Sequence, residues 1–518
     1  MNHLADWQAV LAAMVDIAPK SGDAADDSDI LRSFLPTPAF IRALDPAILL
    51  VLGERGAGKT ALFSVLAARD GLHALLKAAD QRVLGVREVL TLGETARPPQ
   101  VLMHRLLQNT SPARAQVFWL LDLLRGLSSR EGAALPEDVR AVIEAGSWDR
   151  GLDMAEQQVD RLFAAVDTLD AQLRADGGEL TVCYDQLDVL MPTLPGSVQP
   201  IAALFNLWFS QRRRWLRIRP KIFLRVDLFE SVQAAFPDGS KFFAGHQTEL
   251  SWDGMQVWRM WVKRLANRGE PSRQEAVRAW ARRVSRTLDF QEKEGLGQVP
   301  SEVSSEPQLT MFDTFLGVER WEPGERALAP LMYDLVGRYM GASHRKGDAF
   351  RWVPEHVEDG HGRLLARSFL HVLQHAAEIA RERPIGAGAR PIRPADVVQG
   401  LERASVLRLK DVMDEDPWIE QVLPPLEGME VPASEAEWCD LLAKVQWKPA
   451  SDIHARATLP ADTPPQQVLS LLERRGIIQK RSAGKYSVPE IYRAALKVKR
   501  RGGPKRRSEA ALIRAEQE

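Results

Sequence analysis

The chain has 518 residues, with 68 Lys and Arg against 69 Asp and Glu, so its formal net charge is −1. This balance excludes a chain-wide field that would draw the protein to nucleic acid or to a membrane surface. Two cysteines, Cys183 and Cys439, exclude a disulfide framework, and no stretch approaches about 18 consecutive apolar residues. No signal peptide is recognised, so we expect a cytoplasmic protein of about three to four domains.

The first predicted elements are a helix over residues 3–17 and a polar linker over residues 21–29. Residues 34–38, FLPTP, follow as an extended segment, because each proline disfavours helix in the residue before it. A short helix then leads to the uncharged apolar run at residues 48–52, which has the composition of a buried strand. This order places a strand directly before the most informative motif of the chain.

That motif is GERGAGKT, from Gly53 to Thr60, and a helix with apolar positions within residues 62–66 follows it. The pattern G-x-x-x-x-G-K-T between a strand and a helix is typical of a phosphate-binding loop. Its glycines let backbone N–H groups point at phosphate oxygens, and the helix N-terminus adds partial positive charge. A chance Gly-rich turn is the alternative, and the matching strand and helix disfavour it.

Each residue type in this loop has a predicted role. Lys59 reaches the β- and γ-phosphates as a point charge, and the Thr60 hydroxyl ligates Mg²⁺. Residues 34–38 before the loop form either a wall on the adenine side of the nucleotide or a mere connector. The remaining predicted nucleotide-binding positions are Gly53, Gly56, Ala57, Gly58 and Ala61.

A second strand is predicted over residues 82–90, and a long helical insertion over residues 99–170 separates it from the third. The third strand begins at Leu180 and ends in Asp185, an acid that we predict to hold the Mg²⁺ shell beside the phosphate loop. Asp188 follows three residues later. It either orients the attacking water or is an ordinary carboxylate at a helix N-terminus.

The fourth strand, residues 221–224, ends in Arg225 and Asp227. These two residues are either a sensor pair that faces the γ-phosphate or an internal ion pair. We favour the sensor, since ligands of open parallel sheets bind at the carboxyl ends of strands. A fifth strand over residues 249–252 precedes Asp253, which is predicted to cap the next helix. This alternation predicts an α/β fold with a parallel sheet covered by helices.

The C-terminal part predicts short helices followed by two β segments that are joined by a Ser-Ala-Gly turn. This order is typical of a winged helix, with residues 465–475 as the reading helix and residues 480–485 as the wing. Its basic residues either contact nucleic acid or belong to a protein-docking module. The predicted domains are an N-terminal helix and linker (1–33), a P-loop ATPase core (34–268), a helical lid (269–385), a helical connector (386–437), the winged helix (438–500) and a basic tail (501–518).

Several segments together resemble bacterial P-loop ATPases of the AAA+/STAND type, in particular a group found among antiphage-defence and mobile-element genes. The segments are GERGAGKT, VCYDQLD, KIFLRVD, ELSW, GRLLARSFL and GIIQKRSAGKYSVPEIY. The resemblance implies a nucleotide-gated switch in which Asp185 is the Walker B acid, Arg225 is sensor 1 and Arg367, in the lid, is sensor 2. Lys59 and Thr60 would be the Walker A pair.

The chain departs from this family at Gln186 and Val189, where the family places further acids. We therefore expect a Mg²⁺-dependent ATPase that hydrolyses ATP slowly and couples nucleotide state to assembly or to contact with a partner protein, in antiphage defence. The alternative is a DNA-binding initiator or loader ATPase that resembles origin-recognition proteins. A small-molecule kinase is disfavoured, because no signature of an acceptor pocket is evident.

Overall fold

The computed structural model of the protein divides into two compact units, Met1–Pro354 with Leu364–Gly400, and Glu355–Arg363 with Leu401–Glu518. The chain therefore enters the second unit for nine residues, returns to the first, and enters the second again. The residues that the structure describes are 3–17, 30–68, 70–78, 88–92, 97–107, 110–130, 135–187, 198–293, 325–386, 388–447, 459–460, 462–481 and 484–501.

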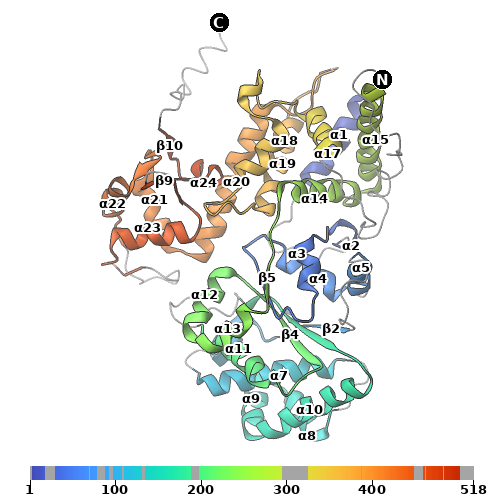
Figure 1. The fold of residues 1–518 in the computed structure, drawn as a ribbon, viewed down its shortest axis with the longest axis vertical. Helices are drawn as coiled ribbons and strands as arrows, with labels where there is room; N and C mark the ends of the chain where they lie inside the picture. The colour runs from blue at the N-terminus through green and yellow to red at the C-terminus, as the bar shows by residue number, and fades with distance from the viewer. Residues whose placement is uncertain are drawn as a thin grey trace. The chain divides into compact units, whose positions relative to one another are not determined.

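A five-stranded parallel sheet forms the centre of the first unit (Figure 1). Strands β1, β3 and most of β4 are buried, as is typical of central strands in parallel sheets. The predicted α/β core with a helix-covered parallel sheet is thus confirmed. In spatial order the strands are β2 (Glu88–Leu92), β3 (Leu180–Tyr184), β4 (Ile218–Leu224), β1 (Leu50–Leu52) and β5 (Gln247–Glu249).

Several predicted strands have other bounds in the structure. Strand β1 begins at Leu50 rather than at residue 48, and β4 begins at Ile218 rather than at residue 221. The described part of the second strand is β2, which runs two residues beyond the predicted end at residue 90, while residues 81–87 lie outside the described part of the chain. The fifth strand was predicted over residues 249–252, but β5 ends at Glu249. The indole of Trp252 instead donates a hydrogen bond to the carbonyl of Ala57, so the chain has already left the sheet at this point.

Alternation of side chains along the strands gives the sheet two apolar faces. Val51 of β1 belongs to a cluster with Phe40 and Leu62, whereas its neighbours Leu50 and Leu52 belong to a larger cluster on the other face. The helices around the sheet include α2 (Ile30–Ser33), α3 (Pro38–Ala43), α4 (Lys59–Ala67), α5 (Gly71–Ala78), α11 (Gln199–Gln211), α12 (Val226–Ala235) and α13 (Pro237–Ala244).

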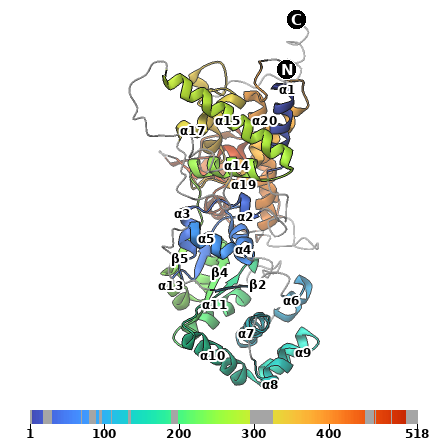
Figure 2. The same cartoon turned by 90° about the vertical axis from the view of Figure 1, so that its right-hand side faces the viewer.

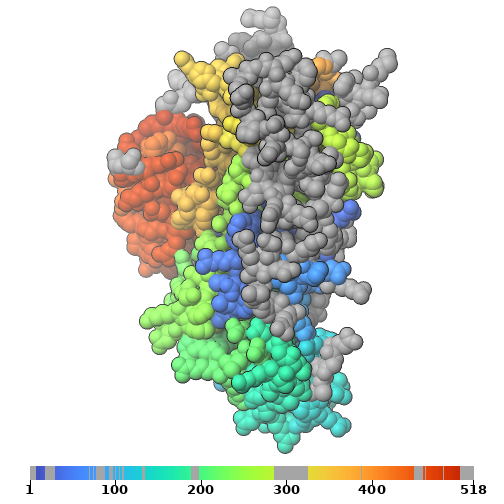
Figure 3. Space-filling model, turned by 45° about the vertical axis from the view of Figure 1, so that its right-hand side comes forward, coloured from blue at the N-terminus to red at the C-terminus, as the bar shows by residue number. Residues whose placement is uncertain are grey.

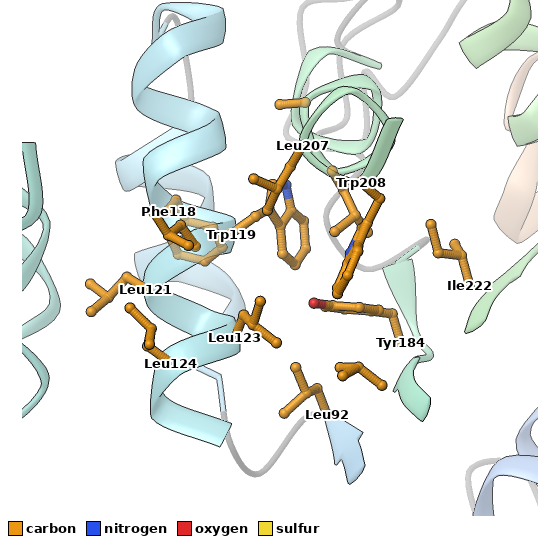
Figure 4. Close-up of a cluster of buried hydrophobic side chains, with 14 of the residues drawn as sticks. Leu92, Phe118, Trp119, Leu121, Leu123, Leu124, Tyr184, Leu207, Trp208 and Ile222 are labelled. Atoms are coloured by element: carbon orange, nitrogen blue, oxygen red, sulfur yellow. The ribbon is translucent and has the colours of Figure 1, made fainter. Parts of the chain in front are cut away.

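The insertion between β2 and β3 is helical, as predicted, and its helices gather at one end of the first unit (Figure 2), where Figure 3 shows their outer surface in teal. Its central helix α7 packs against α11 and buries Phe118 and Trp119 completely. Trp119 lies against Tyr184 of β3, so the insertion shares the core of the sheet (Figure 4). The helices are α6 (Gln100–Leu107), α7 (Pro112–Ser128), α8 (Glu137–Ile143), α9 (Trp148–Gln157) and α10 (Val159–Ala175).

A helical layer completes the first unit, and the N-terminal helix belongs to it, because α1 packs against α15 and α19. Trp258 of α14 stacks on Phe350 with ring centroids 4.8 Å apart, and Asp253 caps α14 through a capping box, as predicted. No helix of the described residues is long and apolar enough to cross a membrane. The helices are α1 (His3–Val15), α14 (Gly254–Asn267), α15 (Pro271–Lys293), α17 (Glu325–Leu335), α18 (Ala349–His356) and α19 (Ala366–Arg381).

The second unit contains a three-stranded antiparallel sheet with the order β7-β9-β8. One of the short helices of the predicted winged helix is expected from residue 451, and residues 448–458 lie outside the described part of the chain. Strand β7 was not predicted, and neither was the parallel pair of β6 (Glu430–Val431) and β10 (Lys499–Arg500). The other elements are α20 (Pro394–Glu415, which begins in the first unit), α21 (Trp418–Leu426), β7 (Ala433–Ser434), α22 (Glu435–Leu442), α23 (Pro465–Arg474), β8 (Gln479–Lys480), β9 (Lys485–Ser487) and α24 (Glu490–Arg493).

The short segment Glu355–Arg363 is held within the second unit by a turn around Asp359. The carboxylate of Asp359 accepts hydrogen bonds from the backbone N–H groups of His361 and Arg363, and its side chain is only 1% exposed. The backbone N–H of Gly360 donates to the carbonyl of Gly476 over 2.7 Å. A Cβ at Gly360 would lie 2.4 Å from the carbonyl oxygen of Ile478, so this close approach requires glycine.

Candidate functional site

The loop between β1 and α4 has the backbone that a phosphate-binding loop needs. Gly56 and Gly58 have positive φ angles of 84° and 104°, which residues other than glycine rarely adopt. Gly58 is the N-cap of α4, so Lys59 and Thr60 lie in the first turn, where N–H groups have no partner within the helix. The Lys59 ammonium donates to the carbonyl of Gly53 over 2.6 Å and therefore lies over the loop.

Aromatic side chains support this loop from its apolar side. A Cβ at Gly58 would lie 2.8 Å from Cζ of Phe40, and Phe40 contacts both Phe34 and Trp252 edge-on. The Trp252 indole donates to the Ala57 carbonyl over 2.8 Å. The segment around residues 34–38 therefore packs behind the loop, and its role as an adenine-side wall stays a prediction.

Arg367 approaches the tip of the loop from the helical layer. It lies in the first turn of α19 (Ala366–Arg381). A Cβ at Gly56 would lie 2.9 Å from Cβ of Arg367 and 3.5 Å from its Nε. The fold thus brings together two residues that are far apart in the sequence, and the left-handed glycine makes room for the arginine. The role of Arg367 as sensor 2 stays a prediction.

The ends of β3 and β4 lie beside the loop because β4 is hydrogen-bonded to both β1 and β3. The N–H of Gly53 donates to the carbonyl of Leu224, the last residue of β4. Asp185 follows β3 and is only 3% exposed. The sheet order therefore gathers the predicted loop, acid and sensor at one edge. Asp188 lies outside the described residues.

Arg225 forms the internal ion pair that was one of its two predicted roles, and its role as a sensor stays a prediction. It is the N-cap residue of α12, directly after β4, and its guanidinium also donates to both carboxylate oxygens of Asp227, over 3.0 and 2.7 Å. A bidentate pair of this kind fixes the guanidinium in one orientation. The internal ion pair is therefore present, at the strand end where the sensor was predicted.

Two residues at this edge were not anticipated from the sequence. Arg97 is 7% exposed and donates to the backbone carbonyl of Asp185 over 2.9 Å. Trp252 donates to the loop itself. Arg97 lies in no motif and is followed by two prolines, whereas Trp252 ends the ELSW segment and was predicted to belong to the fifth strand. Only their tertiary contacts identify them.

In the second unit, one of the basic residues predicted to contact nucleic acid has an acidic partner, because Arg475 pairs with Asp416 over 2.8 Å. Arg481 and Lys485, on the predicted wing, line a pocket of about 690 Å³ that is also lined by acids and by further cations. The acids are Glu355, Glu358, Asp359 and Glu490, and the further cations are Arg493, Arg500 and Arg501. Burial and the neighbouring acids Glu355 and Asp359 raise the pKa of Glu358. The basic tail beyond residue 501 lies outside the described residues.

The sequence matches no protein-family model, and no curated protein is found to be similar to it. Two solved structures are similar to this chain over most of its length. The crystal structure of Cdc6p from Pyrobaculum aerophilum has 13% sequence identity and a TM-score of 0.27, over 86% of each chain. The ORC2 protein of Aeropyrum pernix, solved in ADPNP–ADP complexes, has 13% identity and a TM-score of 0.28, over 91% of this chain and 98% of that chain.

Proposed function

We propose that this protein is a P-loop ATPase of the AAA+ type that binds Mg·ATP at the carboxyl edge of its sheet. The observation that carries the proposal is the meeting of the loop with Arg367 at Gly56. A cation from the helical layer beside a phosphate loop can contact a bound nucleotide from a second side. Asp185 and Arg225 follow the neighbouring strands, so acid, cation and loop share one edge.

The residues present fit Mg·ATP in two respects. The left-handed backbones of Gly56 and Gly58 leave the concave side of the loop to its N–H groups, which is the arrangement that cradles phosphates. The Thr60 hydroxyl and the Asp185 carboxylate supply oxygen ligands, which Mg²⁺ prefers. Bound Mg²⁺ would neutralise charge on the β- and γ-phosphate oxygens, and Lys59 would add a second positive charge there.

We further propose that hydrolysis is slow, so that the ATP-bound state persists as a signal. Gln186 occupies the position directly after Asp185, and its neutral amide is unable to take a proton from an attacking water. The guanidinium of Arg225 is already paired bidentately with Asp227. A nucleotide that remains bound for long supports a switch that changes assembly or partner contact.

The switch can be tested at Arg367. The γ-phosphate distinguishes ATP from ADP, and a ligand shifts an equilibrium only through its differential contacts. Hydrogen exchange in the first turn of α19 should therefore be slower with ATP than with ADP. The Arg367→Ala variant should lose this difference and still bind ADP, whereas Arg381→Ala, at the last residue of the same helix, should retain it. Equal protection with ATP and ADP in the wild type would contradict the switch.

A second candidate function, a DNA-binding initiator-like ATPase, is supported by the topology of the second unit. We propose that α21 to β9 form a winged helix, since a strand, two described helices and a hairpin follow one another and give the order β7-β9-β8. Helix α23 would be the reading helix and residues 480–485 the wing, of which residues 482 and 483 lie outside the described part of the chain. The cations that line the pocket beside this hairpin, among them Arg481 and Lys485, would attract phosphate groups without reading a base sequence.

A further inference from the structure

A buried arginine, Arg97, connects three elements at the edge of the sheet where the nucleotide site is proposed. One terminal nitrogen donates to the carbonyl of Leu92, the last residue of β2, over 2.8 Å. The other donates to the carbonyl of Asp185, directly after β3, over 2.9 Å. Its Nε lies 3.5 Å from a carboxylate oxygen of Asp122 on α7. The guanidinium thus joins β2, β3 and the helical insertion.

The surroundings hold this guanidinium firmly. Its carbon lies 5.4 Å from the ring centroid of Trp119 and 5.8 Å from that of Tyr184, two rings that contact each other edge-on (Figure 4). The Trp119 indole in turn donates to the carbonyl of Pro200 over 2.6 Å. The side chains of Arg97 and Asp122 are only 2% and 1% exposed, so the ion pair is shielded from water.

A buried ion pair of this kind is a weak source of stability, because desolvating both charges offsets their attraction. Burial raises the pKa of the Asp122 carboxyl, and the nearby Arg97 acts in the opposite direction. An apolar pair of similar volume would fill the space without this desolvation cost. The arginine is instead suited to a task that apolar side chains cannot perform, which is to bind two strand-end carbonyls at once.

The peptide that Arg97 binds is an unusual one. The carbonyl of Asp185 belongs to the peptide bond between Asp185 and Gln186, and Gln186 has a φ angle of +58°. Few residues other than glycine adopt this conformation, and they persist in it only where the surroundings hold them. The hydrogen bond from Arg97 holds the peptide directly before this residue, so it also fixes the backbone from which the Asp185 carboxylate projects.

We propose that Arg97 is a positioning residue for the metal-binding acid: it holds the Asp185 backbone in place and ties it to helix α7 of the insertion. This inference rests on the proposed role of Asp185 in binding Mg²⁺. It also names a route by which the insertion acts on the site, because a shift of α7 would move Asp122 and, with it, the guanidinium. A partner that binds the insertion would then alter Mg²⁺ affinity.

The test compares Arg97→Lys with the matched variant Arg130→Lys in the full-length protein. A lysine keeps the charge but is unable to span two carbonyls and a carboxylate. Arg130 also ties the insertion to β2, through a bidentate pair with Glu88, but at the opposite end of the strand. The measurement is binding of a fluorescent ATP analogue, first in EDTA and then as a function of Mg²⁺ concentration.

For Arg97→Lys we expect the Mg²⁺ concentration for half-maximal formation of the ternary complex to rise about 10- to 100-fold, the range found when residues that support metal ligands are changed. Binding in EDTA should be unchanged, and excess Mg²⁺ should restore the complex, which it would not do for a folding defect. Arg130→Lys should leave both measurements at wild-type values. An unchanged Mg²⁺ dependence in folded Arg97→Lys protein would overturn the proposal.

If Arg97→Lys fails to fold, Asp122→Asn replaces it, since this variant leaves both carbonyl bonds possible and removes only the charge that anchors the guanidinium. It should raise the Mg²⁺ requirement by a smaller factor, and wild-type Mg²⁺ dependence would then overturn the proposal. If the wild-type protein fails to bind the analogue at any Mg²⁺ concentration, the proposed ATPase function fails, and the inference about Arg97 fails with it.

Discussion

The carboxyl edge of the five-stranded sheet and the β8–β9 hairpin both collect charged side chains, but they do so in opposite ways. At the sheet edge, Lys59, Asp185 and Arg225 come from distant parts of the sequence and meet because β4 pairs with both β1 and β3. At the hairpin, Lys480, Arg481 and Lys485 are close in sequence, and the last two line one pocket together with residues of both charges.

The charged residues of the sheet edge are brought together by tertiary structure, whereas those of the hairpin are neighbours in the sequence. A parallel sheet places polar residues at one edge whatever their spacing, and a ligand then takes the place of a protein partner. A local basic run is partly neutralised as soon as acidic residues fold against it, and exposed pairs of this kind contribute little energy. We therefore expect strong, specific binding at the sheet edge and weak, salt-dependent binding at the hairpin.

The largest effect is expected at the loop. Lys59→Ala should weaken Mg·ATP binding about 100-fold or more, because it removes a charged contact to phosphate, while the fold survives. Calorimetric titration with ATP measures this affinity. Lys241→Ala, at an exposed position of α13 outside the loop, is the control and should bind as the wild type does. Unchanged ATP affinity in Lys59→Ala would remove the nucleotide assignment and, with it, the contrast between the two regions.

The two aspartates after β3 should separate in function. Asp185→Asn should lose Mg²⁺-dependent binding or turnover, because an amide is a poor replacement for a carboxylate in a Mg²⁺ shell. Asp188→Asn should keep binding but slow hydrolysis, if its carboxylate orients the attacking water. Turnover and binding are measured separately at several Mg²⁺ concentrations. Wild-type turnover in both variants would mean that the metal is held elsewhere.

Two buried lysines of the first unit, Lys263 and Lys221, differ in whether a hydrogen-bond partner among the described residues compensates for their burial. Lys263 of α14 is 1% exposed, its Nζ has no hydrogen-bond partner among the described residues, and burial lowers its pKa to about 7. Lys221 is equally buried, with its pKa lowered to about 8, but it donates to the carbonyls of Asp45 and Ile48. Lys263→Met should therefore raise the unfolding temperature, and Lys221→Met should lower it by leaving two carbonyls unsatisfied.

The pH dependence of stability follows from the same two lysines. An unfolded lysine has a pKa of about 10.4, so the unfolded chain binds more protons than the folded one between the lowered pKa and this value. Stability should rise with pH through this window, from about 7 upward for Lys263, because the neutral amine is the buried form. Thermal unfolding measured from pH 6 to pH 10 should show a flatter profile for Lys263→Met than for the wild type. Parallel profiles would mean that Lys263 is solvated.

The smallest effect is expected in nucleic-acid binding. Removing residues 502–518 should weaken binding to all duplex sequences alike and flatten its salt dependence, whose log–log slope is about −0.9 for each phosphate neutralised. The deletion should start after Arg501, since Lys499 and Arg500 form β10 and Arg501 pairs with Glu437. ATP binding should not change. If the full-length protein binds no DNA or RNA at low salt with ATP present, the initiator alternative fails.

The loop, the acid and the sheet were predictable because each depends on local pattern. Eight residues define the phosphate loop, and an apolar run that ends in Asp185 is recognisable without its neighbours. Asp253 was predicted as a cap, since capping depends on a few adjacent residues. No local sequence pattern indicates that Arg367 approaches Gly56, because the two residues are far apart in the chain. Only the family resemblance singled out Arg367.

Other features depend on contacts that no local pattern encodes. The environment of Arg97 is built from β2, β3 and α7, so its burial could not be read from the residues around it. Strand β7 has two residues, Ala433 and Ser434, too few for alternation to be visible. The pocket that Arg481 and Lys485 line also contains Glu355 and Glu358, which precede the hairpin by a long stretch of chain, and charge runs alone do not identify such neighbours.

The turn at Asp359–Arg363 makes the order of synthesis matter for the second unit. Residues 355–363 leave the ribosome well before Gly476 and Ile478, against which Gly360 packs. The turn therefore lacks these packing partners until the later segment has been synthesised. A fragment that starts at Leu401 would lack residues 355–363, which belong to the second unit. A transfer of this unit to another protein would therefore have to include the nine-residue segment.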